Sequence, residues 1–293
     1  GSPVFVVGTR FQAIMADSLR RHLKMRRYEV VKFFQQRDES STPDMALDQL
    51  VGSAERVVAV DRRKPAFSQF IDLVGETGGA GRAIFLAAIS NPLLMSIFRV
   101  NPMLKLFTFD EGGYNIDPAG PFHNQQASSG FSVKKLFYRL VHPSGSINFA
   151  RRVSKKHYTP FPEELNVFQG RCERICVDWM RYADPGEVQQ LAGRKSVLVL
   201  PCLKDIDEVR RADVLRSANA GRFDLGVRHP RDASDYGIAS LRLQSPVESL
   251  IDALRRSNSV RVFHFGSTVG LTLTSFDNVE IVDLSSARGS FEQ

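Results

Sequence analysis

The sequence predicts an α/β protein with two parallel-sheet domains. In the first half of the chain, short β-branched runs alternate with amphipathic stretches, and this alternation stops in a polar, aromatic and basic region from about 113 to 170. A second alternation starts near residue 196. Strands that alternate with helices form parallel sheets, because each helix returns the chain to the edge where the last strand began. The 293 residues, 43% hydrophobic and 24% charged, are enough for two cores.

The first alternation predicts five strands, at 3–9, 28–34, 56–61, 83–88 and 104–110. Between the first two strands, residues 11–25 have a helical period, with Phe11, Ile14, Met15, Leu19 and Leu23 on one face. The carboxyl ends of these strands are expected to meet at one edge of the sheet, where ligands bind in such folds.

The second alternation predicts strands at 196–203, 223–230, 259–268 and 278–285, with helices near 205–218 and over 247–256. Pro185 and Gly186 interrupt the chain in the stretch 182-YADPGEV-188, which favours a domain boundary there. We therefore expect one domain over 1–182 and a second over 183–293.

Composition predicts the cellular compartment of the protein and the charge of its partner. The apolar stretch 83–98 is interrupted by Ser90, Asn91 and Pro92, so we expect neither a transmembrane helix nor a signal peptide. Three cysteines are too few for a disulfide framework, which favours a reducing cytoplasm. The net charge of +7 favours an anionic partner, either nucleic acid, a phosphate-bearing substrate or an acidic membrane surface.

The stretch 107-FTFDEGGYN-115 ends an apolar strand in two carboxylates and two glycines. The glycines suit a turn, but a turn needs only one Asp or Asn, and two adjacent charges repel each other. We interpret Asp110 and Glu111 as an acid–base pair in which mutual repulsion and partial burial raise one pKa. Thr9, after the first strand, is expected along the same edge.

Two further groups of polar residues follow strands of the second domain. Ser267 and Thr268, after Gly266, place two hydroxyls at a helix start, which suits a phosphate. His229, before Pro230, is expected at a neighbouring strand end, where it could donate a hydrogen bond or a proton to the same phosphate. With a carboxylate of the first domain as base, these groups predict transfer from a nucleotide donor across a cleft between the domains.

In this order, the three motifs Asp110-Glu111-Gly112, His229-Pro230 and Ser267-Thr268 resemble the signature of bacterial sialyltransferases of GT-B architecture. That architecture has two Rossmann-like parallel-sheet domains facing a cleft. The stretches 8-GTRFQAIMA-16, 154-SKKHYT-159 and 246-PVESLI-251 are most similar to the lipooligosaccharide sialyltransferases of glycosyltransferase family 52.

The resemblance implies an inverting sialyltransferase that moves sialic acid from CMP-sialic acid to a terminal galactose hydroxyl of lipooligosaccharide or a related glycan. It implies that Asp110 is the general base, with Glu111 as its supporting neighbour, and that His229 binds the phosphate of the leaving CMP. The other implied roles are phosphate contact by Ser267 and Thr268, ribose contact by Glu248, and sugar or acceptor contact by Gln12 and Thr9. No metal and no cofactor are expected.

The resemblance also implies a glycan or glycolipid acceptor and a place in the bacterial cytoplasm. The basic aromatic segment 134–161 is compatible with contact to an anionic glycolipid or the inner membrane, and equally with an ordinary solvated surface. Homodimers are consistent with the resemblance, and no nucleic-acid recognition motif is present.

Several alternatives stay open at this point. A second His-Pro pair, His142-Pro143, competes with His229, and Asp205 or Asp207 competes with Asp110 as the base. The donor could carry another CMP-activated nonulosonic or ulosonic acid, and a non-catalytic module that binds nucleic acid or anionic lipid also fits the charge. The linkage, 2,3 or 2,6, is not fixed by these motifs. We expect the other histidines (His22, His123, His157 and His264) to be structural.

Overall fold

A computed structural model describes residues 1–33, 45–61, 63–116, 122–123, 145–221, 223–229, 232 and 234–285. The chain divides into two compact units, Gly1–Val177 and Asp178–Gln293. The division precedes the short helix η2 (Trp179–Tyr182), whereas the sequence placed the boundary after it. Because η2 packs against α9 (Val247–Arg255), it belongs with the second unit.

The first unit contains a parallel sheet in the order β3-β2-β1-β4-β5-β6-β7. The five predicted strands are present as β1 (Val4–Val7), β2 (Glu29–Lys32), β3 (Arg56–Ala59), β4 (Ala83–Leu86) and β5 (Lys105–Phe109). The sequence did not predict β6 (His157–Thr159) or β7 (Cys172–Arg174), which extend the sheet beyond β5. Each has only three residues, too few for an alternating pattern to be recognised.

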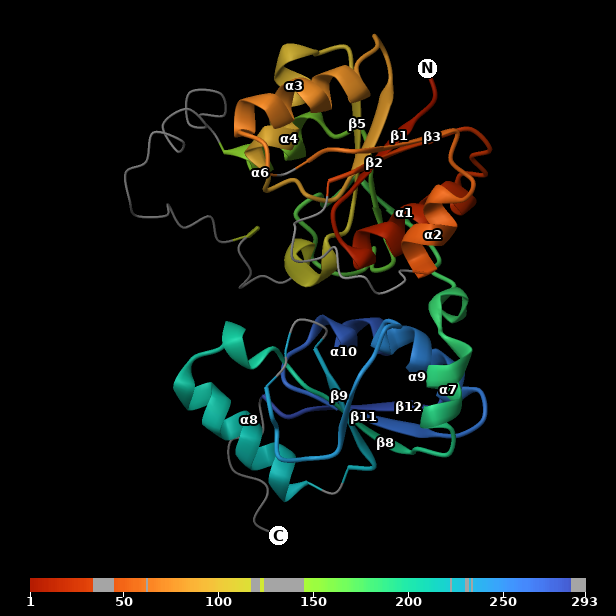
Figure 1. Cartoon of the computed structure of the whole chain (residues 1–293), viewed down its shortest axis with the longest axis vertical. Helices are drawn as coiled ribbons and strands as arrows, with labels where there is room; N and C mark the ends of the chain where they lie inside the picture. Colours follow the sequence, from red (N-terminus) through yellow and green to blue (C-terminus); the bar gives the residue numbers. More distant parts are fainter. Residues whose placement is uncertain are drawn as a thin grey trace. The chain divides into compact units, whose positions relative to one another are not determined.

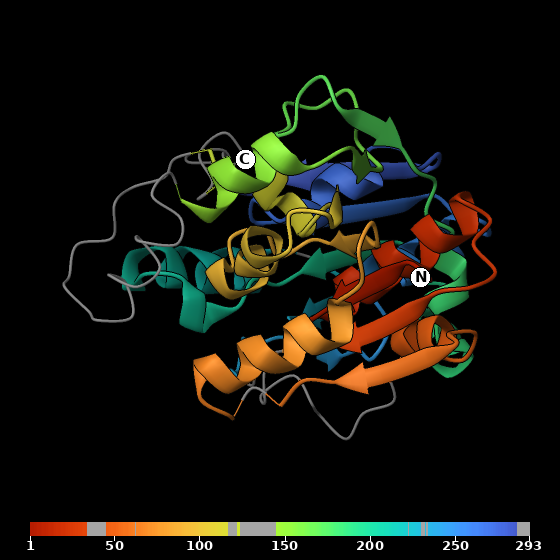
Figure 2. The same ribbon diagram turned by 90° about the horizontal axis from the view of Figure 1, so that it is seen from above.

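Helices cover both faces of this sheet. They are α1 (Arg10–His22), α2 (Met45–Val51), α3 (Ala66–Thr77), α4 (Pro92–Val100) and α6 (Ser146–Val153), with the short helix η1 (Gly112–Asn115) after β5. Helices α1 and α2 pack together on one side, while α3, α4 and α6 lie beside one another on the other side (Figures 1 and 2).

The alternation of side chains along β1 explains the two layers of the first core. Val4 and Val6 belong to the cluster that contains buried residues of α3, α4 and α6. The intervening Phe5 points to the opposite face, where it stacks on Phe85 at 4.9 Å, and Phe85 stacks on Phe107 at 4.9 Å. These rings follow the strand register, because Phe5 pairs with Phe85 and Phe85 with Phe107.

The second unit contains a parallel sheet in the order β10-β9-β8-β11-β12. Its strands are β8 (Ser196–Val199), β9 (Leu225–Arg228), β10 (Ser240–Arg242), β11 (Val260–His264) and β12 (Val279–Asp283), of which only β10 was not predicted. Its remaining helices are α7 (Pro185–Leu191), η3 (Leu203–Asp205), α8 (Glu208–Ala220) and α10 (Thr268–Leu273). One core cluster joins the sheet to α7, α9 and α10, and the other joins it to α8.

In each sheet, successive strands are added on one side of the first strand and then on its other side, so the strand order reverses at one point. In the first sheet this occurs between β1 and β4, and in the second between β8 and β11. Ligands of open parallel sheets bind outside the carboxyl ends of the strands at such points. Within the described parts of the chain, no helix is both long and apolar enough to cross a membrane.

Candidate active site

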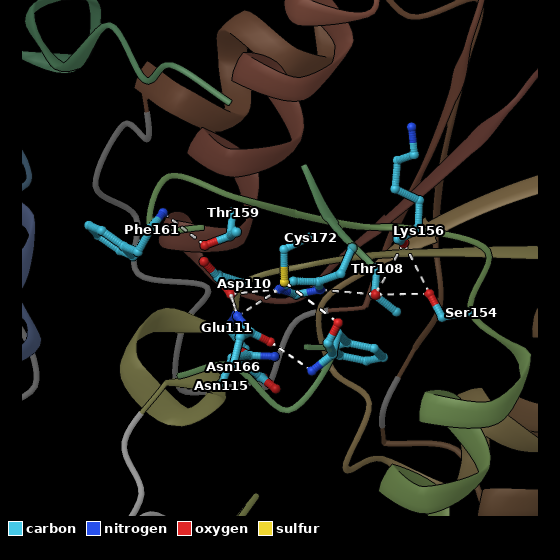
Figure 3. Close-up of polar contacts among 12 residues, drawn as sticks. Thr108, Asp110, Glu111, Asn115, Ser154, Lys156, Thr159, Phe161, Asn166 and Cys172 are labelled. Carbon is cyan, nitrogen blue, oxygen red and sulfur yellow. Dashed lines mark hydrogen bonds and ion pairs between the residues drawn. The ribbon is translucent and has the colours of Figure 1, made fainter. Parts of the chain in front are cut away.

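Asp110 is the first residue after β5, at the carboxyl edge of the first sheet, and it is fully buried. Its Oδ1 atom lies 2.8 Å from His157 Nε2 and 3.4 Å from Asn166 Nδ2 (Figure 3). Its Oδ2 atom is also buried and has no hydrogen-bond partner among the residues that the structure describes. One carboxylate oxygen is therefore held by the protein, and the other has no hydrogen bond within the described residues.

His157 lies on β6, level with Thr108 on β5, and it is fully buried. Its Nδ1 atom is 3.0 Å from Thr108 Oγ1, and its ring stacks on Phe168 at 4.5 Å with an interplanar angle of 13°. The sequence assigned His157 only a structural role, whereas the structure places it in direct contact with Asp110. Its position in the family-like stretch 154-SKKHYT-159 is the signal that could have identified it.

Glu111 links the end of β5 to the first helix. Its Oε1 atom accepts a hydrogen bond of 2.9 Å from Gln12 Nε2, while its backbone N–H donates to Asn115 Oδ1 at 2.9 Å. Burial raises the pKa of Glu111 to about 7, and the Gln12 hydrogen bond opposes this effect. The sequence predicted that repulsion from Asp110 and partial burial together raise one pKa, and for Glu111 the cause is burial alone.

Thr9 lies between β1 and α1, where it is the N-cap of the helix, whereas Gln12, which the sequence placed in that turn, lies in the first turn of α1. Gln12 accepts a hydrogen bond of 2.7 Å from Gly8 N, and Thr9 Oγ1 caps α1 by accepting from Gln12 N at 3.2 Å. A Cβ atom at Gly8 would lie 2.8 Å from the Phe33 carbonyl, so this close turn requires glycine. The Gln12–Glu111 hydrogen bond confirms that the ends of β1 and β5 contribute to one edge.

Three buried polar atoms at this edge lack a partner within the described ranges: Asp110 Oδ2, Glu111 Oε2 and Asn115 Nδ2. Buried polar groups in proteins are nearly always hydrogen-bonded, so unpartnered atoms that lie close together in the chain suggest a ligand. Two carboxylate oxygens and an amide N–H complement sugar hydroxyls, which both donate and accept. No group of three or more His, Cys, Asp or Glu suited to a metal ion occurs in the described residues.

At the carboxyl edge of the second sheet, Ser267 caps the short helix α10. Its Oγ atom accepts from Val269 N at 3.3 Å, and its backbone N–H donates to His264 Nδ1 at 3.1 Å. Because His264 Nδ1 accepts this hydrogen bond, it carries no proton, and burial lowers the pKa of His264, with Asp283 acting in the opposite direction. His264 therefore fixes the Ser267 backbone, a contact compatible with the structural role expected for it. Nothing can be said of the Thr268 side chain, which lies outside the described atoms.

Gly266 gives this turn its shape. It has a φ of +67°, in the left-handed region that favours glycine, and its N–H donates to Asp283 Oδ1 at 3.1 Å. Asp283 is the last residue of β12, so the turn after β11 is tied to the neighbouring strand.

His229 follows β9 directly, as predicted, and is partly buried. The sequence predicted a strand next to that of Ser267 for His229, and this prediction was wrong. Strand β8 lies between β9 and β11 and pairs with both, so the two strand ends are about 10 Å apart. Pro230 and the alternative pair His142-Pro143 lie outside the described residues.

Glu248 lies in the first turn of α9, the helix that connects β10 to β11, so it is at the same carboxyl edge as Ser267. It is buried, and burial raises its pKa to about 7. The next residue, Ser249, is fully buried, and its Oγ atom has no partner in the described part of the chain. Ser249 was not among the site residues predicted from the sequence.

The alternative bases have different surroundings. Asp207 is exposed and caps α8 by accepting a hydrogen bond of 2.8 Å from Arg210 N. The Asp205 side chain is outside the described atoms. Asp207 therefore has a structural role as a helix cap, which Asp110 does not have.

With this geometry established, comparison with known proteins identifies the family. The sequence profile of glycosyltransferase family 52 matches residues 67–287, which is more than half of the chain. The chain belongs to glycosyltransferase family 52. The family match spans both units and includes Asp110, Glu111, His157, His229, Glu248 and Ser267, but not Thr9 or Gln12.

Two curated relatives of this family 52 chain are similar to it over most of its length. An N-acetyllactosaminide alpha-2,3-sialyltransferase of Neisseria meningitidis is 22% identical over 213 residues, covering 70% of the chain and 56% of the relative. A protein of the same name from Haemophilus influenzae is 25% identical over 201 residues, covering 68% of the chain and 62% of the relative. The matched part is thus only about three fifths of each relative's length.

Among solved structures, a UDP-N-acetylglucosamine 2-epimerase has a similar fold. The two chains superpose with a TM-score of 0.50 and 12% sequence identity, over 96% of the family 52 chain and 83% of the epimerase. At this identity the similarity concerns the fold alone. It agrees with the predicted GT-B-like class, which has two Rossmann-like parallel-sheet domains.

Proposed function

We propose that the protein is an inverting sialyltransferase that transfers sialic acid from CMP-sialic acid to a terminal galactose hydroxyl of a lipooligosaccharide or related glycan. Membership of family 52 and the names of both curated relatives support this activity. The single structural observation that carries it is the buried Asp110 carboxylate, which has one oxygen fixed and one unpartnered within the described residues.

In the proposed reaction, Asp110 Oδ2 accepts the proton of the acceptor hydroxyl as its oxygen attacks the anomeric carbon of sialic acid. The new carbon–oxygen bond forms while the bond to the phosphate of CMP breaks. One direct displacement inverts the anomeric centre. General-base assistance of this type contributes about 10² to 10⁴ in rate.

The leaving phosphate is assigned to the second unit. The Ser267 hydroxyl already accepts from Val269 N, which leaves its own O–H free to donate to a phosphate oxygen. His229 would bind or protonate the same phosphate from the other side of β8. Glu248, with Ser249 beside it, would bind the ribose hydroxyls of the cytidine. Because side chains hold the phosphate in this scheme, activity in excess EDTA is the expected result.

The names of the relatives suggest which glycosidic linkage the enzyme forms. Both are described as N-acetyllactosaminide alpha-2,3-sialyltransferases, so we propose an α2,3 linkage to the galactose of an N-acetyllactosamine end. Digestion of the product with linkage-specific sialidases distinguishes α2,3 from α2,6.

We further propose that the acceptor carries an anionic group. In the first unit, a cavity of about 360 Å³ is lined by Asn148, Arg151, Arg152, Val167, Phe168, Gln169 and Arg171. Three of these residues are cationic and none is acidic, which suits a phosphate or carboxylate. Peripheral contact with the inner membrane from the cytoplasm, and dimer formation, remain predictions. The rest of the basic segment, 134–144, lies outside the described residues.

The test is incubation with CMP-sialic acid and N-acetyllactosamine, with measurement of CMP release and of the sialylated product. The expected result is product formation well above the rate of donor hydrolysis. CMP release that does not increase with acceptor concentration would contradict the proposal. A second arm with other CMP-activated nonulosonic acids tests the choice of donor sugar.

A further inference from the structure

We propose that His157 is the positioning residue of this transferase, and that it holds Asp110 with Oδ2 free by donating its Nε2–H to Oδ1. This inference rests on the proposed function, because it concerns the proton transfer assigned to Asp110. It goes further by giving a role to a histidine on a strand that the sequence did not predict.

The chemistry of the two groups fixes the direction of their hydrogen bond. An ionised carboxylate only accepts, so at 2.8 Å from Asp110 Oδ1 the imidazole must carry a proton on Nε2. The amide nitrogen of Asn166 is 3.3 Å from the same Nε2 and 3.4 Å from Oδ1. Both nitrogens are then donors, so Asn166 supports the carboxylate rather than the ring.

A hydroxyl relay satisfies the other ring nitrogen in either protonation state. Thr108 Oγ1 is 3.0 Å from His157 Nδ1 and 3.0 Å from Ser154 Oγ, which donates to the Lys156 carbonyl at 3.0 Å. With a neutral ring, the Thr108 hydroxyl donates to Nδ1. With a protonated ring, it accepts from Nδ1–H and donates to Ser154. The Nε2–H bond to Asp110 is kept in both cases.

Packing then prevents the ring and the carboxylate from turning. Phe168 covers one face of the imidazole, and its backbone N–H donates to Asn166 Oδ1 at 3.0 Å. The turn that supplies Asn166 and Phe168 thus supports both members of the pair. Effects of this kind are large in enzymes, because a displacement of about 1 Å in a reacting group can cost roughly 10² in rate.

Among the titratable groups near Asp110 and His157, none other than His157 forms a hydrogen bond or ion pair with Asp110 in the described residues. Cys172 on β7 is opposite His157, and burial, with the charge of Asp110, raises the pKa of its thiol to about 11, so it stays neutral near pH 7. Glu111 is next in the chain. Lys156, which precedes His157, pairs with Glu173. Within the described ranges, no Lys or Arg pairs with Asp110.

Two substitutions test whether the hydrogen bond to Asp110 matters, or only a polar side chain at position 157. Gln in His157→Gln carries an amide nitrogen the same number of bonds from the backbone as Nε2, so it can still donate to Asp110. In His157→Asn the side chain is shorter and its amide nitrogen lies at the level of Nδ1. It therefore cannot reach Asp110, and the hydrogen bond is lost. We expect kcat within about tenfold of wild type for Gln, but a loss on the order of 10²-fold for Asn with little change in acceptor KM.

The pH profile is the readout that a purely structural role would not move. A donor to the charged form favours that form, so its loss in His157→Asn should shift the rising limb of kcat/KM by about one pH unit to higher pH. His157→Gln should keep the limb near its wild-type position. Equal activity and an unshifted limb in both folded variants would overturn the inference, as would equal loss without a shift.

A measurement on the unmutated histidine guards against variants that fail to fold. In ¹⁵N-histidine-labelled protein, His157 should show a proton on Nε2 whose signal changes in Asp110→Asn. An imidazole protonated only on Nδ1 would also overturn the inference. Failure of the proposed function is distinct from both results, since it appears as absence of sialyl transfer by the wild-type protein.

Discussion

The two sheet edges hold their polar groups in contrasting ways. At the edge of the first sheet, Asp110 and Glu111 each bind one side-chain donor, His157 and Gln12, and each keeps one buried oxygen unpartnered within the described residues. At the edge of the second sheet, the Ser267 backbone N–H donates to His264 Nδ1 and its Oγ atom accepts from Val269 N, which leaves the Ser267 O–H to donate to a ligand. A buried acceptor suits proton transfer, whereas a hydroxyl that can donate suits a phosphate. This contrast agrees with the proposed roles, in which the first unit supplies the general base and the second binds the donor phosphate.

The largest expected effect comes from removing the base. Asp110→Asn keeps the size of the side chain but cannot accept the proton, so we expect transfer to fall by about 10² to 10⁴ while CMP binding is unchanged. The matched control is Asp207→Asn, because Asn is as good a helix cap as Asp and should preserve α8. Loss of transfer in the control, with activity retained in Asp110→Asn, would move the base to the second unit. Steady-state kinetics and CMP titration calorimetry supply both measurements.

Removal of the hydroxyl donors should have the next largest effect. We expect Ser267→Ala combined with Thr268→Ala to weaken CMP binding by roughly 10² or more, since a hydrogen bond to a charged group is worth about 1.5 kcal/mol or above. The control is Ser275→Ala, near the end of α10, where the hydroxyl donates to the Thr272 carbonyl. Unchanged CMP affinity in the double variant would remove Ser267 and Thr268 from the donor site.

The buried glutamates provide a third comparison, in which pH changes stability. The folded pKa of Glu111 is about 7 against an ordinary value of 4.5, so the folded state binds more protons between these values. The free energy of unfolding should therefore fall as pH rises from 4.5 to 7, by about 3 kcal/mol in total, and then level off. Glu111→Gln should remove this dependence and be the more stable protein at pH 8.

Urea titrations at pH 5, 6, 7 and 8, followed by circular dichroism, test this expectation. Glu248, whose pKa is also about 7, is the equivalent group in the second unit, so Glu248→Gln should have an effect of the same sign. A slope with pH that persists in both variants would show that other groups cause it.

The smallest expected effect concerns the arginine-lined cavity. Arg151→Gln should raise KM for a phosphorylated acceptor by a few-fold, as expected for one exposed charge contact, and leave KM for neutral N-acetyllactosamine unchanged. Arg194→Gln, an exposed arginine of the second unit, controls for the loss of net charge. A parallel rise for both acceptors would argue against an anionic group bound in this cavity.

Much of the fold could be predicted from the sequence, because long βα repeats have a strong local signal. Strands such as β1 and β11 and helices such as α1 and α9 lie where the periodicity placed them. The short strands β6, β7 and β10 could not be predicted, since three residues carry no period and pairing with a neighbouring strand defines them. The contact of His157 with Asp110 could not be predicted for the same reason, because its strand was not recognised.

The sequence by itself determined the two α/β units, the positions of Asp110, His229 and Ser267 at strand ends, and the family. These features depend on local patterns of side chains and on turns, which neighbouring residues specify. Only the tertiary structure decided that His157 and Asn166 hold Asp110, that desolvation sets the pKa of Glu111, and that β8 separates His229 from Ser267. Strand order and burial arise from contacts between residues distant in sequence, so no local pattern contains them.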